Sequence, residues 1–304
     1  MSDAIPFDHS KPRAGRLEQV SPLVRRWVLD NPGPFTYTGT CAYVVGQGKV
    51  CVIDPGPGLA GEAEALLKAL GSESVVDIAV THTHRDHSPG ARTLKALTGA
   101  PISGCQPHWA ARALNLGERS LLDASADRDH RPDRVMQEGD TLAGVGFRLI
   151  GLATPGHTMN HLCFVLPEEN ALFSGDHVMA WSTSIVAPPD GSMNAYMASL
   201  DKLRGRSESL YWPGHGGPVT EPQRFVRALL GHRKMREASI LKAVQDGSST
   251  ILQLVEQLYV GLAPGLKGAA ALSVFAHLED LVQRGLVTSD GPVTLEERYS
   301  AETV

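Results

Sequence analysis

The stretch Val80 to Gly90 reads VTHTHRDHSPG and places three histidines and one aspartate within six residues. In an extended segment, His82 and His84 point to the same side, because side chains alternate with a period of two. Asp86 and His87 follow where the strand gives way to a turn, and they point to a second position nearby. Two pairs of ligands from one peptide predict two divalent metal ions. Imidazole with carboxylate and no thiolate favours Zn²⁺, with Mn²⁺ or iron as alternatives.

The residues before this stretch predict a strand, a helix and a second strand. Thr40 to Asp54 contains two β-branched runs around a Gly-Gln-Gly-Lys turn, which indicates a hairpin. Glu62 to Leu70 has helical apolar spacing, and VVDIAVT then predicts a strand buried on both faces. The histidine stretch therefore lies at the carboxyl end of a strand, where α/β proteins commonly bind ligands.

Three further ligand candidates each follow a glycine at the end of a predicted strand. His157 in TPGHT follows FRLIGLA, Asp176 in SGDH follows ALF, and His215 in PGH follows LYW. Glycine permits a sharp turn there and leaves room for the backbone to approach closely. Taken alone, each would be an ordinary turn residue, but together they extend the metal-binding pattern.

The remaining patterns predict helices that cover sheets, followed by a separate helical module. Arg92 to Leu97 and Trp109 to Leu114 have helical spacing, while PISG and LCFVLP indicate short strands. After Pro222, three consecutive helical patterns are each followed by a glycine stop. A hairpin is expected at the end, with Leu286–Thr288 and Val293–Leu295 joined through an Asp-Gly turn.

In their order and spacing, HTHRDH, GHT, SGD and PGH resemble the motifs of the metallo-β-lactamase fold superfamily over about residues 20 to 220. The resemblance implies an α/β (α+β) protein, an αββα sandwich with a dinuclear site at one edge. The change of pattern after Pro222 predicts a boundary between a catalytic domain at residues 1–222 and a C-terminal domain at residues 223–304, which similarity to one branch of the superfamily implies to be winged-helix-like. It assigns His82, His84 and His157 to the first metal ion, Asp86, His87 and His215 to the second, and Asp176 to both.

Three residues near these ligands have other expected roles. Asp54, in VIDPGPG, matches an aspartate that supports the metal-binding loop in the superfamily, where ligating histidines need partners that orient them. His161 is not a ligand in the pattern, and either lining of the pocket or simple packing explains it. His177 directly follows Asp176 and is expected to point away from the metal ions.

The expected chemistry is hydrolysis. Two metal ions share a water, lower its pKa towards 7, and deliver a hydroxide to a carbonyl or phosphorus centre. Asp86 is the candidate general base as well as a ligand, because its second oxygen can take the proton of the attacking water. We therefore expect a zinc-dependent hydrolase that needs no serine or cysteine nucleophile.

The tail narrows the resemblance to one branch of the superfamily. The chain is similar to the LACTB-2-like enzymes in three stretches, which are AWSTSIVAPPDGSMNAYMASLDKL after Asp176, PGHGGPV, and HRKMREASIL. This similarity implies cleavage of phosphodiesters in single-stranded RNA. The charge of the tail does not favour RNA, because residues 223–304 contain nine Lys or Arg and nine Asp or Glu. We expect the module to serve packing, the rim of the pocket or a homodimer contact. The basic residues 232–236 could still meet a phosphate, although a solvated helix face is the simpler interpretation.

Other functions remain open beside RNA cleavage. A thioester or lactone hydrolase similar to glyoxalase II is a close alternative, and an iron-dependent oxidoreductase is another. A non-catalytic nucleic-acid-binding protein fits less well, because no ligand position is missing. β-Lactamase activity is not expected, since no export signal is visible.

The composition is that of a folded protein. The chain has 304 residues, 42% hydrophobic types and a formal charge of −5, so nothing global indicates a polyanionic partner. The first fifteen residues contain no apolar signal-peptide core, and no run is long enough to span a membrane, so we expect a cytoplasmic protein with no membrane partner. The scattered cysteines Cys41, Cys51, Cys105 and Cys163 are expected to be buried reduced thiols.

Overall fold

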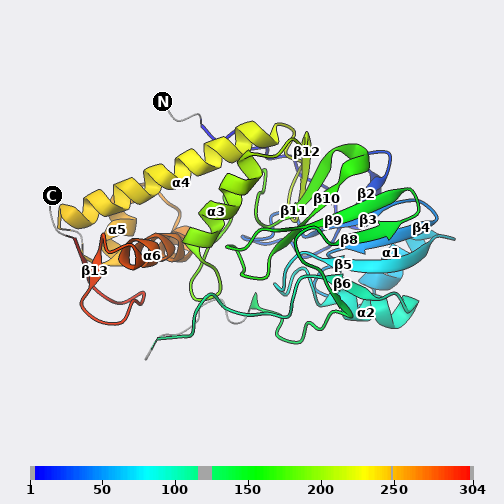
Figure 1. The fold of residues 1–304 in the computed structure, drawn as a ribbon, viewed down its shortest axis with the longest axis horizontal. Coiled ribbons are helices and arrows are strands. Elements are labelled where there is room, and N and C mark those ends of the chain that lie inside the picture. The colour runs from blue at the N-terminus through cyan, green and yellow to red at the C-terminus, as the bar shows by residue number, and fades with distance from the viewer. Residues whose placement is uncertain (1–3, 116–124, 248, 302–304) are drawn as a thin grey trace.

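The computed structural model describes residues 4–115, 125–247 and 249–301, and within them two β-sheets pack face to face between layers of helices (Figure 1). The seven-stranded first sheet contains, in spatial order, β1 (Leu17–Gln19), β2 (Val24–Val28), β3 (Cys41–Val45), β4 (Lys49–Ile53), β5 (Ser74–Val80), β6 (Ile102–Gly104) and β7 (Arg134–Val135). Strands β1 to β4 pair antiparallel, and β4 to β7 pair parallel.

The five-stranded second sheet has the spatial order β12-β11-β10-β9-β8. Its strands are β8 (Thr141–Gly144), β9 (Phe147–Ala153), β10 (Leu162–Leu166), β11 (Ala171–Gly175) and β12 (Leu210–Pro213). Only β11 and β12 pair parallel, so their carboxyl ends lie at the same edge of the sheet. Asp176 and His215 follow these two ends and are therefore brought together.

Two apolar cores hold the sandwich together. In the first core, the inner faces of both sheets meet, and α1 (Glu62–Leu70) and α2 (Gly90–Thr98) cover the first sheet with Leu66 and Leu94. In the second core, α3 (Met193–Arg204) and α4 (Pro222–Gln245) cover the outer face of the second sheet. The layers are helix, sheet, sheet and helix, which confirms the predicted αββα sandwich.

Helix α4 continues from the sandwich into the C-terminal helices (Figure 1). Its first half packs on the second sheet through Phe225 and Leu229. Its second half, with Ile240 and Val244, packs against α5 (Ile251–Leu258) and α6 (Lys267–Gln283) in a third core. The predicted domain boundary after residue 222 coincides with the start of α4 and stays a prediction.

Two sequence-based expectations are wrong. The predicted helix from Trp109 to Leu114 is irregular, because its backbone bonds elsewhere: the Ala111 N–H donates to the carbonyl of Pro189 (2.8 Å). In the C-terminal hairpin, β13 (Thr288–Ser289) pairs with β14 (Tyr299–Ser300) and not with residues 293–295. Val293 and Leu295 instead pack against the third core, which makes the connection longer than an Asp-Gly turn.

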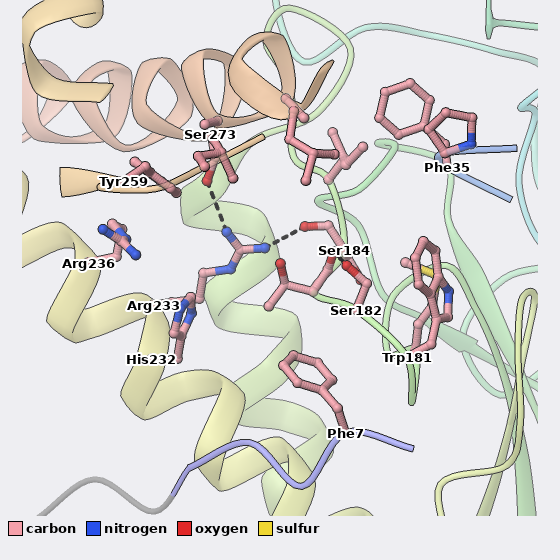
Figure 2. A pocket seen from close by; sticks show the side chains of 18 of the residues that line it. Phe7, Phe35, Trp181, Ser182, Ser184, His232, Arg233, Arg236, Tyr259 and Ser273 are labelled. Carbon is pink, nitrogen blue, oxygen red and sulfur yellow. Dashed lines mark hydrogen bonds between the residues drawn. The ribbon is translucent and has the colours of Figure 1, made fainter. Parts of the chain in front are cut away.

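A cavity of about 470 Å³ lies between α4, the segment 179–185 after β11, α6, and the residues Tyr259, Leu262 and Leu266 that connect α5 to α6 (Figure 2). We call it the α4 cavity.

All four cysteines are buried free thiols, as expected. In the described part of the chain, no helix is both long and apolar enough to cross a membrane.

Candidate metal centre

Asp54, which follows β4, anchors the loop after β5. Its carboxylate accepts hydrogen bonds from the Thr81 N–H (2.8 Å) and the Thr81 hydroxyl (2.6 Å), and its Oδ2 lies 3.1 Å from His87 Nδ1. Asp54 has a positive φ of 49°, a conformation that aspartate and asparagine adopt more readily than most residues. This is the geometry that the expected supporting role requires.

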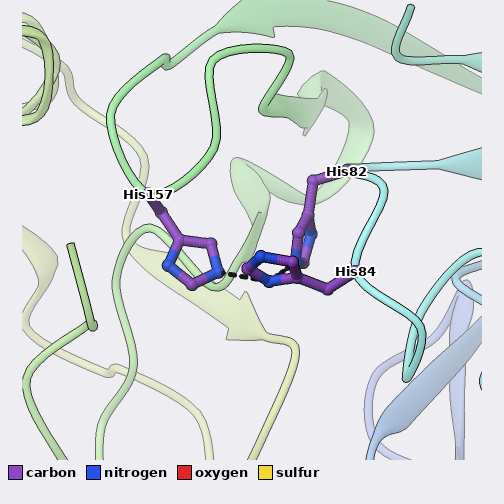
Figure 3. A group of neighbouring side chains, drawn as sticks. All are labelled: His82, His84 and His157. Carbon is purple, nitrogen blue, oxygen red and sulfur yellow. Dashed lines mark hydrogen bonds between the residues drawn. The ribbon is translucent and has the colours of Figure 1, made fainter. Parts of the chain in front are cut away.

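The first group of ligand candidates consists of His82, His84 and His157 (Figure 3). His84 Nδ1 lies 3.2 Å from His82 Nε2 and 3.0 Å from His157 Nε2, so three ring nitrogens converge on one point. One nitrogen from each residue can be chosen so that all three lie within 4.8 Å of one another. Strands β5 and β9, which precede these residues, bring them together across the two sheets.

The second group consists of Asp86, His87, Asp176 and His215, which also lie within the same mutual distance. His215 Nε2 lies 3.1 Å from Asp86 Oδ2 and 3.4 Å from Asp176 Oδ2. Asp176 Oδ1 lies 3.5 Å from His87 Nε2, and its Oδ2 lies 3.7 Å from His157 Nε2 of the first group. Asp176 therefore stands between the two groups, in the position expected of a bridging carboxylate.

Each of the five histidines in the two groups has a partner for its outer ring nitrogen, the one that does not face the other ligand candidates. His82 Nδ1 lies 3.0 Å from Thr81 Oγ1, His84 Nε2 3.1 Å from Asp190 Oδ2, His87 Nδ1 3.1 Å from Asp54 Oδ2, His157 Nδ1 2.6 Å from the Ile185 carbonyl, and His215 Nδ1 3.3 Å from the Gly39 carbonyl. Because these partners can accept the ring proton, each ring in its neutral form keeps the lone pair of its inner nitrogen directed at the cluster. Such an arrangement orients histidines for metal binding.

The electrostatics of the two groups differ. Burial lowers the pKa of His82 and brings that of His157 to about 4, so their converging lone pairs stay unprotonated near neutral pH. Burial also opposes charge on His215, but the carboxylates of Asp176 and Asp86 prevail and raise its pKa to about 9. The second group therefore favours a positive charge at its centre, which a divalent cation would provide.

Packing around the bridging position also suits a cation. The buried Asp176 Oδ1 has no hydrogen-bond partner among the described residues. A Cβ atom at Gly214 would overlap with this oxygen and would lie 2.6 Å from His87 Cε1, so only glycine leaves the space open. The donor set of five imidazoles and two carboxylates fits two divalent ions such as zinc.

Two neighbouring histidines do not join the groups. His161 is buried, its Nδ1 lies 2.9 Å from Thr154 Oγ1, and its Nε2 accepts a hydrogen bond from the Asp176 N–H (3.2 Å). It therefore packs beneath the cluster and fixes the backbone of Asp176. The His177 ring points away and lies 4.5 Å from the ring of Tyr196.

Sequence reasoning missed Asp190 and His108. The Asp190 carboxylate is buried, accepts from His84 Nε2, and lies 3.3 Å from His108 Nε2. An aspartate between Pro-Pro and Gly has the appearance of a turn residue, and its link to His84 spans 106 positions of sequence. Only the tertiary structure identifies it.

Comparison with known proteins agrees with this fold and this cluster. Residues 36–215 match the Metallo-beta-lactamase superfamily, and residues 250–293 match the Beta-lactamase associated winged helix domain. Two solved structures share the fold: a Beta-lactamase domain protein from Burkholderia ambifaria (TM-score 0.79, 20% identity, 97% of each chain) and a metallo-beta-lactamase family protein from Thermus thermophilus (TM-score 0.75, 24% identity, 93% of this chain and 100% of that one).

The chain belongs to the metallo-β-lactamase superfamily of hydrolases, and its clustered histidines and aspartates could hold metal ions. Atrochrysone carboxyl ACP thioesterase AgnL7 of Paecilomyces divaricatus is 30% identical over 99% of this chain and 91% of its own length. Beta-lactamase-like protein 2 homolog of Caenorhabditis elegans is 29% identical over 89% of this chain and 88% of its own length. The predicted winged helix and superfamily are thus confirmed.

Proposed function

We propose that the protein is a dinuclear, zinc-dependent hydrolase of acyl thioesters. His82, His84 and His157 would hold one ion, Asp86, His87 and His215 the other, and Asp176 would contact both. The observation that carries the substrate class is the α4 cavity, whose wall residues Ile185 and Ser184 contact His157 and Asp176 directly. Its walls are largely apolar, and about 470 Å³ accommodates a medium-sized acyl group.

Two divalent ions held by these residues would supply Lewis acidity toward the thioester carbonyl and would lower the pKa of water. Asp86 is the group of this chain best placed to take the proton of the attacking water. Its side chain is 27% exposed, whereas the side chains of the other ligand candidates are at most 9% exposed. Burial opposes its charge, but His87 and His215 prevail and hold its pKa well below the usual range, so it is a carboxylate at neutral pH. The water oxygen would bond to the carbonyl carbon, the C–S bond would break, and the leaving thiolate would take up the proton held by Asp86, so the products are a carboxylic acid and a thiol.

The relatives support the same substrate class. AgnL7 and the Cryptosporiopsis sp. protein dmxR1, which is 28% identical over 93% of this chain, are both named ACP thioesterases. A lactone is the nearest alternative ester, because the same centre would attack its carbonyl.

Single-stranded RNA is the second candidate, and one observation favours it. A separate hollow of about 260 Å³ is lined by Lys11, Arg13, Arg16 and Arg26 together with Glu18. Such a cluster of cations could attract a phosphate backbone. The tail offers less support, because α6 is buried at every residue from Val274 to Leu281 and presents no open face there to a groove.

The test combines metal analysis with a substrate panel. Purified protein is analysed for bound metal and assayed with an aromatic and an aliphatic acyl thioester, a lactone, a phosphodiester and single-stranded RNA, beside His84→Ala. We expect two equivalents of zinc, thioester turnover, and a loss of at least about 100-fold in kcat/KM for the variant, because a metal ligand is removed.

Other outcomes identify the alternatives. Cleavage of RNA without thioester turnover, abolished by the combined change Lys11→Gln, Arg13→Gln and Arg16→Gln, would establish the nuclease instead. One bound iron with oxygen consumption would establish the oxidoreductase. If His84→Ala equals the wild type on every substrate cleaved, the metal centre is not the active site.

A further inference from the structure

Arg233 on α4 is a buried cation with no acidic partner among the residues that the structure describes. Its residue is 2% exposed, and it forms no ion pair with any carboxylate in the described part of the chain. Its Nη1 donates to Ser273 Oγ (3.2 Å) and its Nη2 to the carbonyl of Ser184, while its buried Nε has no partner there. Arginine keeps its charge in proteins, so a full positive charge is buried here with no negative charge beside it among the described residues.

Burying a charge in this way is costly unless something else neutralises it. Two neutral hydrogen-bond acceptors and the ring of Tyr196, 5.4 Å from the Arg233 guanidinium carbon, provide only partial compensation. Arg233 lines the α4 cavity, where its guanidinium lies between α6 and the segment 179–185 (Figure 2). The missing negative charge can therefore come from a molecule in the cavity.

The rest of the cavity lining agrees with an anionic occupant. None of the described residues that line it is an aspartate or glutamate, and Arg236, one helical turn after Arg233, adds a second cation. Arg236 stacks on Tyr259, with its guanidinium carbon 4.1 Å from the ring centroid, and donates to the carbonyl of Leu258 (3.0 Å). His232 is neutral, because burial and the two arginines lower its pKa to about 4.

The other part of the lining is apolar. Phe7, Phe35, Ile185, Leu262 and Leu266 contribute to the walls. A ligand that fills this space would therefore have a hydrocarbon or aromatic body and one anionic end, which Arg233 would bind.

Arg233 is connected to the metal centre by short contacts. The Ser184 carbonyl that accepts from Arg233 belongs to a residue whose hydroxyl donates to the Asp176 carbonyl (2.5 Å), and the adjacent Ile185 carbonyl accepts from His157 Nδ1 (2.6 Å). An acyl chain with one end at the centre could thus place its other end near Arg233.

We propose that the α4 cavity binds a carboxylate with an apolar body on Arg233, and that this carboxylate is the far end of the acyl group of the substrate. The identification as substrate rests on the proposed thioesterase function. The preferred substrates would then be monothioesters of dicarboxylic acids. A separate effector with a carboxylate and an apolar body would bind Arg233 in the same way. Binding of suberate without a preference for carboxylated thioesters would identify such an effector.

The test compares thioesters that differ only by a terminal carboxylate. Glutaryl, adipyl and suberyl thioesters of N-acetylcysteamine are compared with the pentanoyl, hexanoyl and octanoyl thioesters. For at least one chain length, we expect a kcat/KM at least 10-fold higher for the carboxylated member, mainly through a lower KM. Arg233→Met should abolish this preference with little change for the uncharged series, and Arg233→Lys should restore part of it.

Lys234→Gln is the matched control, because it removes one charge from an exposed neighbour on the same helix. It should leave the preference unchanged. A structural role for Arg233 would lower turnover of both series equally and lower the melting temperature. A ligand-binding role predicts that unliganded Arg233→Met melts no lower than the wild type, since a buried charge that is only partly compensated is removed.

Direct binding separates this inference from the proposed function. If no thioester is cleaved, the thioesterase proposal fails, but binding of suberate alone can still be measured by calorimetry. Saturable suberate binding that Arg233→Met removes supports the carboxylate site. If suberate binds but the carboxylated thioesters are not preferred, the carboxylate is an effector and its assignment to the substrate is wrong. Absence of both binding and preference overturns the site itself.

Discussion

At the scale of single residues, the metal centre depends on side chains that do not touch the metal positions. Asp54 links Thr81 to His87 within the loop after β5. Asp190 orients His84, and His161 holds the Asp176 backbone. Each fixes which ring nitrogen or backbone group faces the cluster. The affinity for metal should therefore respond to changes one layer away from the ligands.

Asp54→Asn tests this dependence. Asparagine tolerates the positive φ at this position, so the backbone should be retained, but its side chain cannot accept from both Thr81 and His87 as a carboxylate does. We expect metal affinity to fall about 10- to 100-fold, measured by competition with a chromogenic chelator. Asp77→Asn, on the neighbouring β5 and outside both ligand groups, should bind metal like the wild type.

Gly214→Ala tests the space between the two groups. The new methyl group would overlap with Asp176 Oδ1 and press on the His87 ring. We expect loss of at least one bound metal ion by elemental analysis while the circular dichroism spectrum stays unchanged. Gly205→Ala is the control, because its nearest contact would be an ordinary 3.6 Å. Retention of two ions by Gly214→Ala would contradict the bridging position of Asp176.

At this scale, sequence patterns find the residues that gather in the candidate metal centre but not all of their partners. The spacing of His82, His84, Asp86 and His87 is local, so alternation and turn chemistry suffice to predict it. Asp190 and the carbonyls of Ile185 and Gly39 reach the cluster only through the tertiary fold. A backbone carbonyl leaves no mark in the sequence, and a turn aspartate has many simpler explanations.

At the scale of elements, local propensity predicts well where local interactions decide. The predicted helix Glu62–Leu70 is found with the same bounds as α1, because strong helix formers are followed by a glycine. Trp109–Leu114 has similar spacing, but backbone bonding to the 187–191 loop prevails. The terminal hairpin differs for the same reason, since Val293 and Leu295 gain more by packing on the third core.

Helix α5 illustrates a local interaction with a measurable effect. Thr250 forms a reciprocal capping box with Gln253, in which its hydroxyl accepts from the Gln253 N–H (3.3 Å) and the Gln253 side chain accepts from the Thr250 N–H (3.1 Å). Thr250→Ala should lower the free energy of unfolding by about 1 kcal/mol in urea titrations, because the cap is lost. Thr250→Ser keeps the hydroxyl and should retain most of the stability, whereas equal losses would show that the cap is unimportant.

At the scale of the whole molecule, α4 couples the sandwich to the C-terminal helices. Phe225 and Leu229 belong to the second core, Ile240 and Val244 to the third, and Arg233 lies between them at the α4 cavity. The ion pair of Arg112 with Glu279 adds a connection from the sandwich to α6. The sequence predicts the helices of this module, but the cavity depends on how they dock, which periodicity alone does not specify.

This docking buries His277 of α6, which makes the stability of the whole chain dependent on pH. Burial, together with the nearby Arg233 and Arg236, lowers the pKa of His277 to about 3, whereas an unfolded chain has a histidine pKa of about 6.5. Above about pH 6.5 both states are neutral at this residue. Between about pH 6.5 and 3 only the unfolded state binds the proton, so stability falls as the pH falls, by about 1.4 kcal/mol per pH unit.

His277→Gln removes this titration and should make the acid dependence of unfolding shallower by that amount. The measurement is urea unfolding of metal-free protein between pH 7 and 4.5, so that loss of metal does not contribute. His9→Gln, which replaces an exposed histidine, should leave the slope of the wild type unchanged. An equal slope in the wild type and His277→Gln would mean that His277 gains a proton in the folded state as well. In that case α6 would be docked less tightly than in this structure.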